Sequence, residues 1–306
     1  MRRVIPVAVF LATVFAGDWL ISRVARGLVE RSQNPIVRML RGEQPSDVVF
    51  LGDSRIDRNI DFAHVQARTG LRPLNLGLGG NSMVVSEALL RDYLDRYGPP
   101  TAVVVELGQT TVDPQSMGEM RVLACLSTNL LGVACAVDPW YSRGERVFGT
   151  LRFNDASFWR LAAEALQPPT PRTLTNRIPA VVVREWSGER RVDRPLYPEN
   201  FAALRRICEL ADQHHFRLAL IIGPCWPGYR RAIVNFAGWR DALQSVAGSR
   251  PLADYSLCFG EEADVYNDEL HLNAQGAVRF VDRLLADGWL AGDAARRELP
   301  ANSATR

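Results

Sequence analysis

Three side chains of this sequence have the types and the spacing needed for nucleophilic catalysis. Ser54 directly follows an apolar run in the stretch VVFLGDSRIDRN, residues 48–59. A serine hydroxyl becomes a good nucleophile only when a base takes its proton, and a histidine base works best when a carboxylate orients its ring. Asp268 and His271 lie three residues apart, so one helical turn or a tight loop places both on the same side. The three residues predict acyl transfer through an acyl-enzyme.

The other histidines fit the role of base less well. Of the four histidines, His64 lies midway along a predicted amphipathic helix, and His214 and His215 end a predicted helix, where an imidazole is ordinary. His271 alone follows a predicted strand with a carboxylate beside it. Two simpler interpretations stay open: Ser54 could serve only as a helix N-cap, and the DELH segment could be an exposed turn.

The oxyanion of a tetrahedral intermediate needs hydrogen-bond donors, and losing one donor typically costs about 10² to 10³ in rate. The glycine-rich backbone GLGGNS, residues 77–82, can approach a substrate closely, and the backbone amide of Ser54 at a helix start adds another donor. The same glycines suggest a dinucleotide-binding GxGxxG pattern. However, Ser82 stands where the third glycine would be, and the stretch follows the second strand rather than the first. We therefore set the nucleotide interpretation aside.

The elements that must position these residues alternate between apolar runs of strand length and stretches of helical periodicity. Runs such as AVVVEL, residues 102–107, lack polar alternation, which indicates a parallel sheet covered by helices on both faces. We expect an α/β fold with the site beyond the carboxyl ends of the strands. The predicted strands are 47–52, 72–77, 101–108, 216–224 and 251–256. The first predicted helix follows the first strand and ends near 69, and the others cover about 82–97, 200–214, 229–246 and 274–290.

Regular alternation stops between residues 111 and 199. This stretch holds many prolines and several tryptophans and shows no clear period, so we interpret it as an insertion that decorates the sheet and shapes a substrate surface. We expect a signal anchor and juxtamembrane helix at 1–31, a catalytic domain at 45–292 and a disordered tail at 293–306.

The N-terminus looks like an export signal. Arg2 and Arg3 precede VIPVAVFLATVFAG, and Asp18 interrupts before WLISRV continues. A spanning helix needs about 20 mostly apolar residues, so 4–21 spans a bilayer only with Asp18 near the outer interface. The amphipathic pattern beyond Asp18 favours a retained, single-pass inner-membrane anchor, with the remainder in the periplasm or at the cell exterior. The alternatives are a cleaved signal peptide, with VFA before Gly17, and a buried N-terminal helix.

Composition limits the partners and cofactors. The 306 residues include 36 basic and 34 acidic side chains without long blocks of one sign, so there is no electrostatic case for nucleic-acid binding. The five cysteines show no CxxC spacing and no nearby histidine pair, so we expect no metal and no cofactor. Cys125 and Cys135 could form a disulfide in an oxidising compartment.

Four sequence blocks in order make the chain resemble the SGNH, or GDSL-type, hydrolase superfamily. The resemblance covers roughly 45–112 and 200–290, and it implies a three-layer α/β/α sandwich with a parallel, flavodoxin-like five-stranded sheet. The blocks are Gly52-Asp53-Ser54, NLGLGGNS at 75–82, VVVELGQTT at 103–111 and DELH at 268–271.

The resemblance also carries site residues over to this chain. It implies that Ser54 is the nucleophile, that Asp268 and His271 complete the triad, and that Gly80 donates to the oxyanion, with Gly79 as the nearest alternative. The triad agrees with the one that residue types and spacing indicate.

The third block departs from the family pattern. Gly-x-Asn-Asp is usual there, and its asparagine donates to the oxyanion, whereas Gly108 is followed here by Gln109 and Thr110. Gln109 could supply an amide, Thr110 could supply a hydroxyl, or the site could work slowly with two donors. Beside the nucleophile, we expect Asp53 to hold the turn and Arg55 to be solvated in the first helical turn. The alternative for Arg55 is contact with an anionic group of the substrate.

We therefore expect a serine esterase or O-acyltransferase that acts on acylated carbohydrate or another small ester. The altered third block and the N-terminal anchor resemble membrane-tethered relatives that move acyl groups on cell-surface polysaccharides, which implies partners in polysaccharide biosynthesis. One alternative is a catalytically weak or inactive binding or scaffold protein with the same fold. Another is a lipid-directed hydrolase, which the polar, proline-rich insertion disfavours.

Overall fold

The structure is a computed structural model of the chain that describes residues 4–108, 114–167 and 174–290. The chain divides into two compact units. All the strands of the sheet and the candidate triad belong to the second unit. The first unit comprises Met1–Gln44, Glu87–Tyr97 and Val112–Pro171, and the second comprises Pro45–Ser86, Gly98–Thr111 and Arg172–Arg306.

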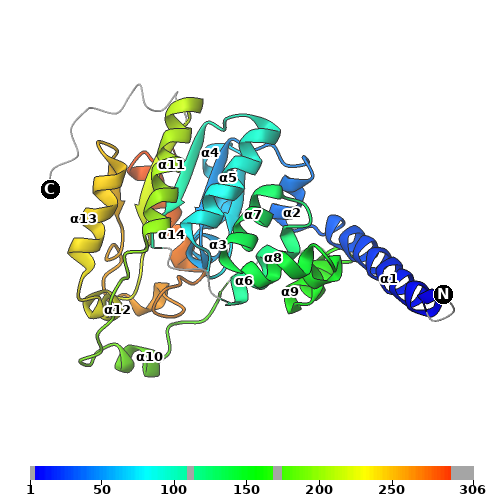
Figure 1. Cartoon of the computed structure of the whole chain (residues 1–306). Coiled ribbons are helices and arrows are strands. Elements are labelled where there is room, and N and C mark those ends of the chain that lie inside the picture. Colours follow the sequence, from blue (N-terminus) through cyan, green and yellow to red (C-terminus); the bar gives the residue numbers. More distant parts are fainter. Residues whose placement is uncertain (1–3, 109–113, 168–173, 291–306) are drawn as a thin grey trace. The chain divides into compact units, whose positions relative to one another are not determined.

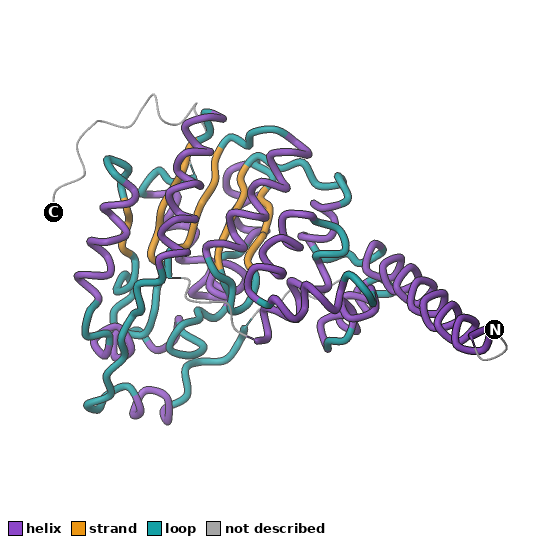
Figure 2. The backbone as a smooth tube through the Cα atoms, in the orientation of Figure 1, coloured by secondary structure: helices purple, strands orange, loops and turns teal. Residues whose placement is uncertain are grey.

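The second unit is built around a five-stranded parallel sheet, and Figure 2 shows its strands side by side. The strand order is β2-β1-β3-β4-β5, with every neighbouring pair parallel. This is the flavodoxin-like order, so the predicted α/β fold is confirmed. The bounds are Val48–Gly52 for β1, Pro73–Gly77 for β2, Ala102–Glu106 for β3, Arg217–Ile222 for β4 and Leu252–Asp254 for β5.

Helices cover both faces of this sheet. The helices of the second unit are α3 (Ser54–Asn59), α4 (Phe62–Thr69), α10 (Ala180–Glu185), α11 (Pro198–His214), α12 (Pro227–Ala232), α13 (Phe236–Ala247), η2 (Ala263–Val265) and α14 (Ala274–Ala286). A further helix, α5 (Met83–Tyr97), begins in the second unit and ends in the first. Every residue of β1 and β3 is buried, and Phe50 and Val104 share a core cluster with Phe280 of α14. In Figure 1, α11 lies in front of the sheet and α14 behind it. Burial on both faces explains the uninterrupted apolar runs.

Two stretches predicted as single helices each contain two. After β1, α3 ends at Asn59 and α4 begins after Asp61, whose side chain accepts a hydrogen bond from the backbone N–H of His64 at 2.9 Å. After α12, Ile233 forms a short parallel bridge with Val192. The cap at Asp61 begins a new helix after α3, and the bridge at Ile233 interrupts the helix after α12. Both breaks occur although the helical periodicity of the sequence continues through them.

The first unit is helical, including the part of the stretch 111–199 that it contains. Its helices are α1 (Val4–Glu30), α2 (Pro35–Leu40), α6 (Pro114–Leu123), α7 (Thr128–Val137), α8 (Pro139–Glu145), η1 (Gly149–Phe153) and α9 (Ala156–Glu164). Ser127, Asp138 and Asp155 cap α7, α8 and α9 by accepting backbone hydrogen bonds. Helices of ten residues or fewer show too few turns for a period to be visible, which explains why the sequence looked irregular there.

The disulfide that the sequence allows between Cys125 and Cys135 is not formed. Cys125 is buried just after α6, whereas Cys135 lies on α7, and both are free thiols. Burial raises the pKa of Cys125 to about 12, so its thiol stays protonated.

Among the described residues, one helix is long and apolar enough to cross a membrane. In α1, Ile5–Glu30 includes an 18-residue window with a mean hydropathy of 1.8, and none of it is buried. Figure 1 shows α1 as one continuous helix. Asp18, in its middle, accepts hydrogen bonds from the backbone N–H groups of Gly149 and Thr150 at 2.9 and 3.1 Å, which join α1 to η1. The predicted N-terminal apolar helix is confirmed.

Candidate active site

The turn after β1 carries Ser54 as the first residue of α3. At Gly52 an added Cβ would lie 2.5 Å from Cγ1 of Ile56, so this close approach requires glycine. The side chain of Asp53 caps α3 by accepting a hydrogen bond from the backbone N–H of Arg55 at 2.8 Å. The prediction that Asp53 holds the turn is confirmed. The turn leaves Ser54 half-buried, with its hydroxyl within reach of other groups.

The structure brings Ser54, His271 and Asp268 together. Nε2 of His271 lies 2.7 Å from Oγ of Ser54, although 217 positions separate the two residues in the sequence. Nδ1 of the same ring lies 2.9 Å from each carboxylate oxygen of Asp268. With the ring proton on Nδ1, Asp268 accepts it and Nε2 accepts the hydroxyl proton of Ser54. The arrangement can therefore remove the proton of Ser54 during nucleophilic attack.

Asp268 is held in its ionised form. Burial alone would raise its pKa, but the hydrogen bond and charge of His271, together with the backbone N–H groups of Leu270 and His271, lower the pKa of Asp268 to about 2. Both backbone N–H groups donate to Oδ1 at 2.9 Å. An ionised carboxylate keeps the ring N–H on Nδ1 and stabilises the positive charge that the ring acquires.

Asn59 joins the two segments that carry the triad. It is 1% exposed, at the end of α3. Its Nδ2 donates to the carbonyl of Leu270 at 3.2 Å, and its Oδ1 accepts from the backbone N–H of Leu272 at 2.8 Å. These bonds lie on either side of His271, so one short helix positions both the nucleophile and the base. Sequence reasoning missed Asn59, because an amide at a helix end most simply indicates a cap.

Arg55 is buried between two carboxylates, so the expectation of a solvated arginine is wrong. It is 4% exposed, and its Nη2 lies 2.9 Å from Oδ2 of Asp53 and 3.0 Å from Oε2 of Glu106. Burial alone would raise the pKa of Asp53, but the charge of Arg55 lowers it below its usual value. The sequence gives no sign of this pairing, since Glu106 comes from another strand.

Glu106 connects the ends of three strands. It is 1% exposed at the end of β3, and its carboxylate accepts hydrogen bonds from the backbone N–H of Gly108 at 3.0 Å and of Gly223, after β4, at 3.1 Å. Arg55, after β1, is its ion-pair partner. At Gly108 an added Cβ would lie 1.9 Å from Nη1 of Arg55, so a larger residue there would displace the guanidinium from its two carboxylates. Burial raises the pKa of Glu106, and the charge of Arg55 opposes this shift.

The turn that contains Gly80 lies beside the end of β1. The backbone N–H of Asn81 closes it by donating to the carbonyl of Leu78 at 2.9 Å, and Gly80 has a φ of +69°, which favours glycine. Nδ2 of Asn81 donates to the carbonyl of Gly52 at 3.1 Å. Gly79 is exposed, with open space where a Cβ would point.

The oxyanion donors stay a prediction. Gln109 and Thr110, the two candidates from the third block, lie outside the described residues. The backbone amides of Ser54 and Gly80 follow the carboxyl ends of β1 and β2, which are neighbours in the sheet. Donors from adjacent strand ends can converge on one oxygen atom.

His64 has a structural partner on another helix. His64, on α4, places Nε2 2.9 Å from Oδ1 of Asp282 on α14, which ties the two helices together. Within 4–108, 114–167 and 174–290, no group of three or more His, Cys, Asp or Glu side chains could hold a metal ion.

No model of a known protein family matches the chain, and no curated protein matches it. The resemblance to the SGNH superfamily therefore depends on the four sequence blocks of the chain itself.

Replacing Asn59 by leucine tests its positioning role. The variant leaves the carbonyl of Leu270 and the N–H of Leu272 without their partner. Each unsatisfied buried group costs about 1–3 kcal/mol of stability. We expect the free energy of unfolding to fall by about 2–5 kcal/mol, and kcat of the still-folded variant to fall at least about tenfold, because the loop of His271 shifts. Urea titration and ester hydrolysis below the melting temperature measure the two effects. Arg58→Ala, a neighbouring half-buried change, is the control, and full kcat in folded Asn59→Leu would contradict the role.

Replacing Arg55 by methionine tests the buried charges. Asp53 and Glu106 would lose their shared cation, and breaking a buried pair in this way costs about 3–5 kcal/mol. The matched control is Arg72→Met, which removes an exposed ion pair with Asp47 and should cost about 1 kcal/mol or less. Chemical denaturation at pH 7 measures both, and equal losses would show that the network does not stabilise the strand ends.

Proposed function

We propose that this protein is a serine-dependent ester hydrolase or O-acyltransferase that works through an acyl-enzyme. The observation that carries the proposal is the hydrogen-bonded series from Oγ of Ser54 through His271 to Asp268, with heavy-atom distances of 2.7 and 2.9 Å. Its position beyond the carboxyl ends of parallel strands is where α/β proteins bind ligands. The ordered sequence blocks of an SGNH-type hydrolase support the same conclusion.

The mechanism follows from the roles of these groups. Oγ of Ser54 attacks the ester carbonyl while Nε2 of His271 takes the hydroxyl proton, and the backbone amides of Ser54 and Gly80 stabilise the oxyanion. The tetrahedral intermediate collapses as His271 returns the proton to the leaving alcohol, which leaves an acyl group on Ser54. A second hydroxyl compound, activated by His271, then attacks the acyl group and regenerates the serine. Asp268 keeps the ring oriented throughout.

The second hydroxyl compound decides between two activities. Water makes the protein an esterase, and a sugar hydroxyl makes it an O-acyltransferase. Acylated carbohydrate outside the cytoplasm is the proposed substrate class, with partners from polysaccharide biosynthesis or export.

The apolar helix α1 supports a single-pass anchor in the inner membrane. Arg2 and Arg3 precede its apolar run, and positive charge favours the cytoplasmic side of a membrane. The catalytic unit would then face the periplasm or the cell exterior.

A scaffold protein with the same fold and little activity is the second candidate. The observation that favours it is Thr110 in the place of the usual asparagine of the third block. A protein of this kind would keep the fold of the site without turning over esters.

Ser54→Ala tests the proposed chemistry directly. We expect wild-type protein to hydrolyse p-nitrophenyl acetate and to be labelled covalently by a fluorophosphonate probe, because the probe captures a serine activated by a neighbouring base. The variant should not be labelled, and its hydrolytic activity should fall at least about 10³-fold. Ser157→Ala on α9 is the control. Labelling that persists in Ser54→Ala would remove the proposal, and an unlabelled wild type would favour the scaffold.

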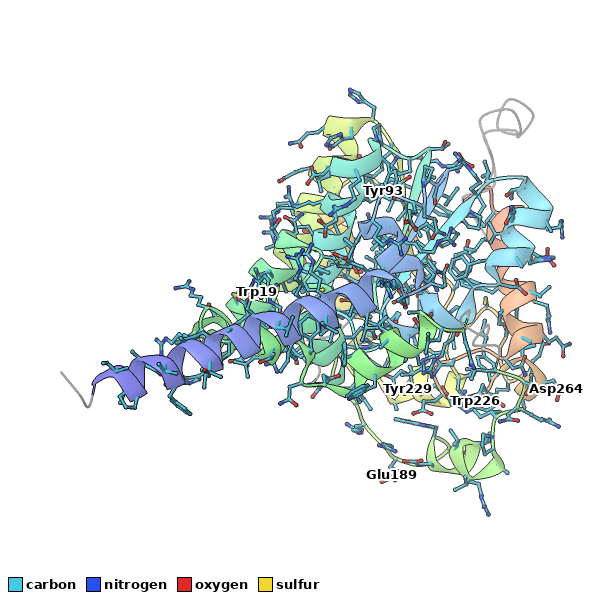
Figure 3. The ribbon with its side chains drawn as sticks, turned by 90° about the vertical axis from the view of Figure 1, so that its right-hand side faces the viewer. Trp19, Tyr93, Glu189, Trp226, Tyr229 and Asp264 are labelled. Atoms are coloured by element: carbon cyan, nitrogen blue, oxygen red, sulfur yellow. The ribbon has the colours of Figure 1, made fainter. Side chains whose placement is uncertain are left out.

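Asp268→Asn tests the orienting carboxylate. We expect kcat to fall by about 10³ to 10⁴, since asparagine cannot hold the productive tautomer. Asp264→Asn, an exposed carboxylate labelled in Figure 3, is the control.

The same variant tests the lowered pKa of Asp268. Its pKa falls from a model-compound value of 3.8 to about 2 in the folded protein, so the ionised carboxylate stabilises the fold above about pH 4, and this contribution is lost as the pH falls towards 2. The difference in unfolding free energy between wild type and Asp268→Asn should shrink over that range. A difference in unfolding free energy that grows on acidification would contradict the lowered pKa of Asp268.

A further inference from the structure

Two arginines of the second unit form no ion pair with an acidic side chain among the described residues. Arg194, which precedes α11, is 7% exposed, and its Nη1 donates to the carbonyl of Gly108 at 2.6 Å. Its Nε is buried and has no hydrogen-bond partner. Arg230, on α12, is half-buried, and its Nε donates to the neutral hydroxyl of Ser256 at 3.3 Å. Across the described residues, neither guanidinium forms an ion pair with a carboxylate.

The two guanidinium groups share one aromatic support on α13. Arg230 lies over the ring of Phe236, and Arg194 lies over the ring of Trp239 at 5.2 Å. The two rings are themselves in contact, with centroids 5.5 Å apart. The arginines are thus held in fixed positions by cation–π contacts rather than by carboxylates.

Their positive charges act on each other. Burial lowers the pKa of Arg230 below its usual value; the charge of Asp254 and the Cys225 thiol oppose this shift, and the charge of Arg194 adds to it. Asp254 already accepts a hydrogen bond from the backbone N–H of Ser256 at 2.9 Å. Two like charges held close together in a partly buried place favour a bound anion, which offsets their repulsion.

Contacts through other residues connect this pair to the segments that carry Ser54 and His271. Gly108, to which Arg194 donates, is in direct contact with the guanidinium of Arg55, the residue after Ser54. On the other side, α12 begins after Trp226, whose backbone N–H donates to the carbonyl of Glu269 at 2.8 Å. Glu269 belongs to the loop of Asp268 and His271.

Tyr229, adjacent to Arg230, is near enough to Arg55 to interact with its charge. Figure 3 labels Trp226 and Tyr229 close to each other on this side of the unit. The segment that carries Arg230 therefore flanks the active-site edge of the sheet.

We propose that Arg194 and Arg230 form an anion subsite beside Ser54 that binds a carboxylate or phosphate group of the ester substrate. The inference rests on the proposed function and narrows its substrate class to acidic esters, such as an acylated uronic acid or an ester that carries a phosphate. A guanidinium offers planar, forked donors that match both carboxylate and phosphate oxygens. The N–H groups of Arg230 beyond its Nε are the donors available for them, and the largely buried Arg194 adds its positive charge.

The experiment uses the full chain in a neutral detergent and compares charged ligands with neutral analogues. We test D-glucuronate and glycerol 3-phosphate as competitive inhibitors of p-nitrophenyl acetate hydrolysis. D-glucose is the neutral control for glucuronate, and glycerol is the neutral control for glycerol 3-phosphate. They are also titrated calorimetrically into Ser54→Ala, which reports binding without catalysis. Arg230→Glu reverses one charge of the subsite. Arg231→Glu is the matched control, because Arg231 is exposed and pairs with Glu261 at 3.0 Å.

We expect at least one of the two anions to bind and neither neutral analogue to do so. Arg230→Glu should weaken anion binding at least about tenfold, while Arg231→Glu changes it less than about twofold. A single cooperative urea transition shows that Arg230→Glu is folded. Arg231→Glu, outside the subsite, should hydrolyse neutral p-nitrophenyl acetate as wild type does. If glucuronate binds more tightly than glycerol 3-phosphate, the ligand is an acidic sugar. If glycerol 3-phosphate binds more tightly, the ligand is a phosphate ester.

The failures of the two proposals are distinguishable. Ester hydrolysis without binding of either anion, or equal weakening by Arg230→Glu and Arg231→Glu, would overturn the anion subsite and leave the hydrolase proposal standing. Anion binding without any serine-dependent hydrolysis would overturn the proposed function and leave a binding site for an acidic ligand.

Discussion

The carboxylate of Glu106 is the constraint on which the candidate site depends. It holds Arg55 after β1, the backbone of Gly108 after β3 and the backbone of Gly223 after β4. Parallel strands end at one edge of a sheet, but their connecting segments are free to diverge unless something joins them. A buried charge with several donors can do this, because each lost contact leaves a polar group unsatisfied in a place that water does not reach. The edge of the sheet is thus rigid where the nucleophile sits.

The six-residue helix α3 transfers this rigidity to the triad. Its first residue, Ser54, is fixed by the capped turn at Asp53, and its last residue, Asn59, holds the backbone on both sides of His271. The proposed nucleophile and base are therefore positioned by opposite ends of one short helix. A loop that depended on the single bond between Ser54 and His271 would leave the alignment of the two side chains less well fixed.

The sheet and the triad were accessible from the sequence because each leaves a local trace. Strands buried on both faces appear as uninterrupted apolar runs, and a serine after such a run, with an Asp-x-x-His segment near the end of the chain, limits the candidates for nucleophile and base. Arg55 and Asn59 leave no such trace. Their partners, Glu106 and the backbone beside His271, come from distant segments, so an arginine in a first helical turn suggests exposure and an asparagine suggests a cap. The capped short helices of the first unit escaped detection for a different reason, since a period cannot be read from two turns.

The hydrogen bonds from η1 to Asp18 limit the depth to which α1 can enter a lipid phase. The residues before Asp18 give a helical length of about 20 Å, at 1.5 Å per residue, against about 30 Å for the hydrocarbon core of a bilayer. A bilayer that α1 crosses must therefore thin locally, or η1 and its neighbour Phe148, which stacks on Phe15, must enter the headgroup layer. If α1 is such an anchor, the first unit in either case rests directly on the lipid surface, with no flexible stalk between them.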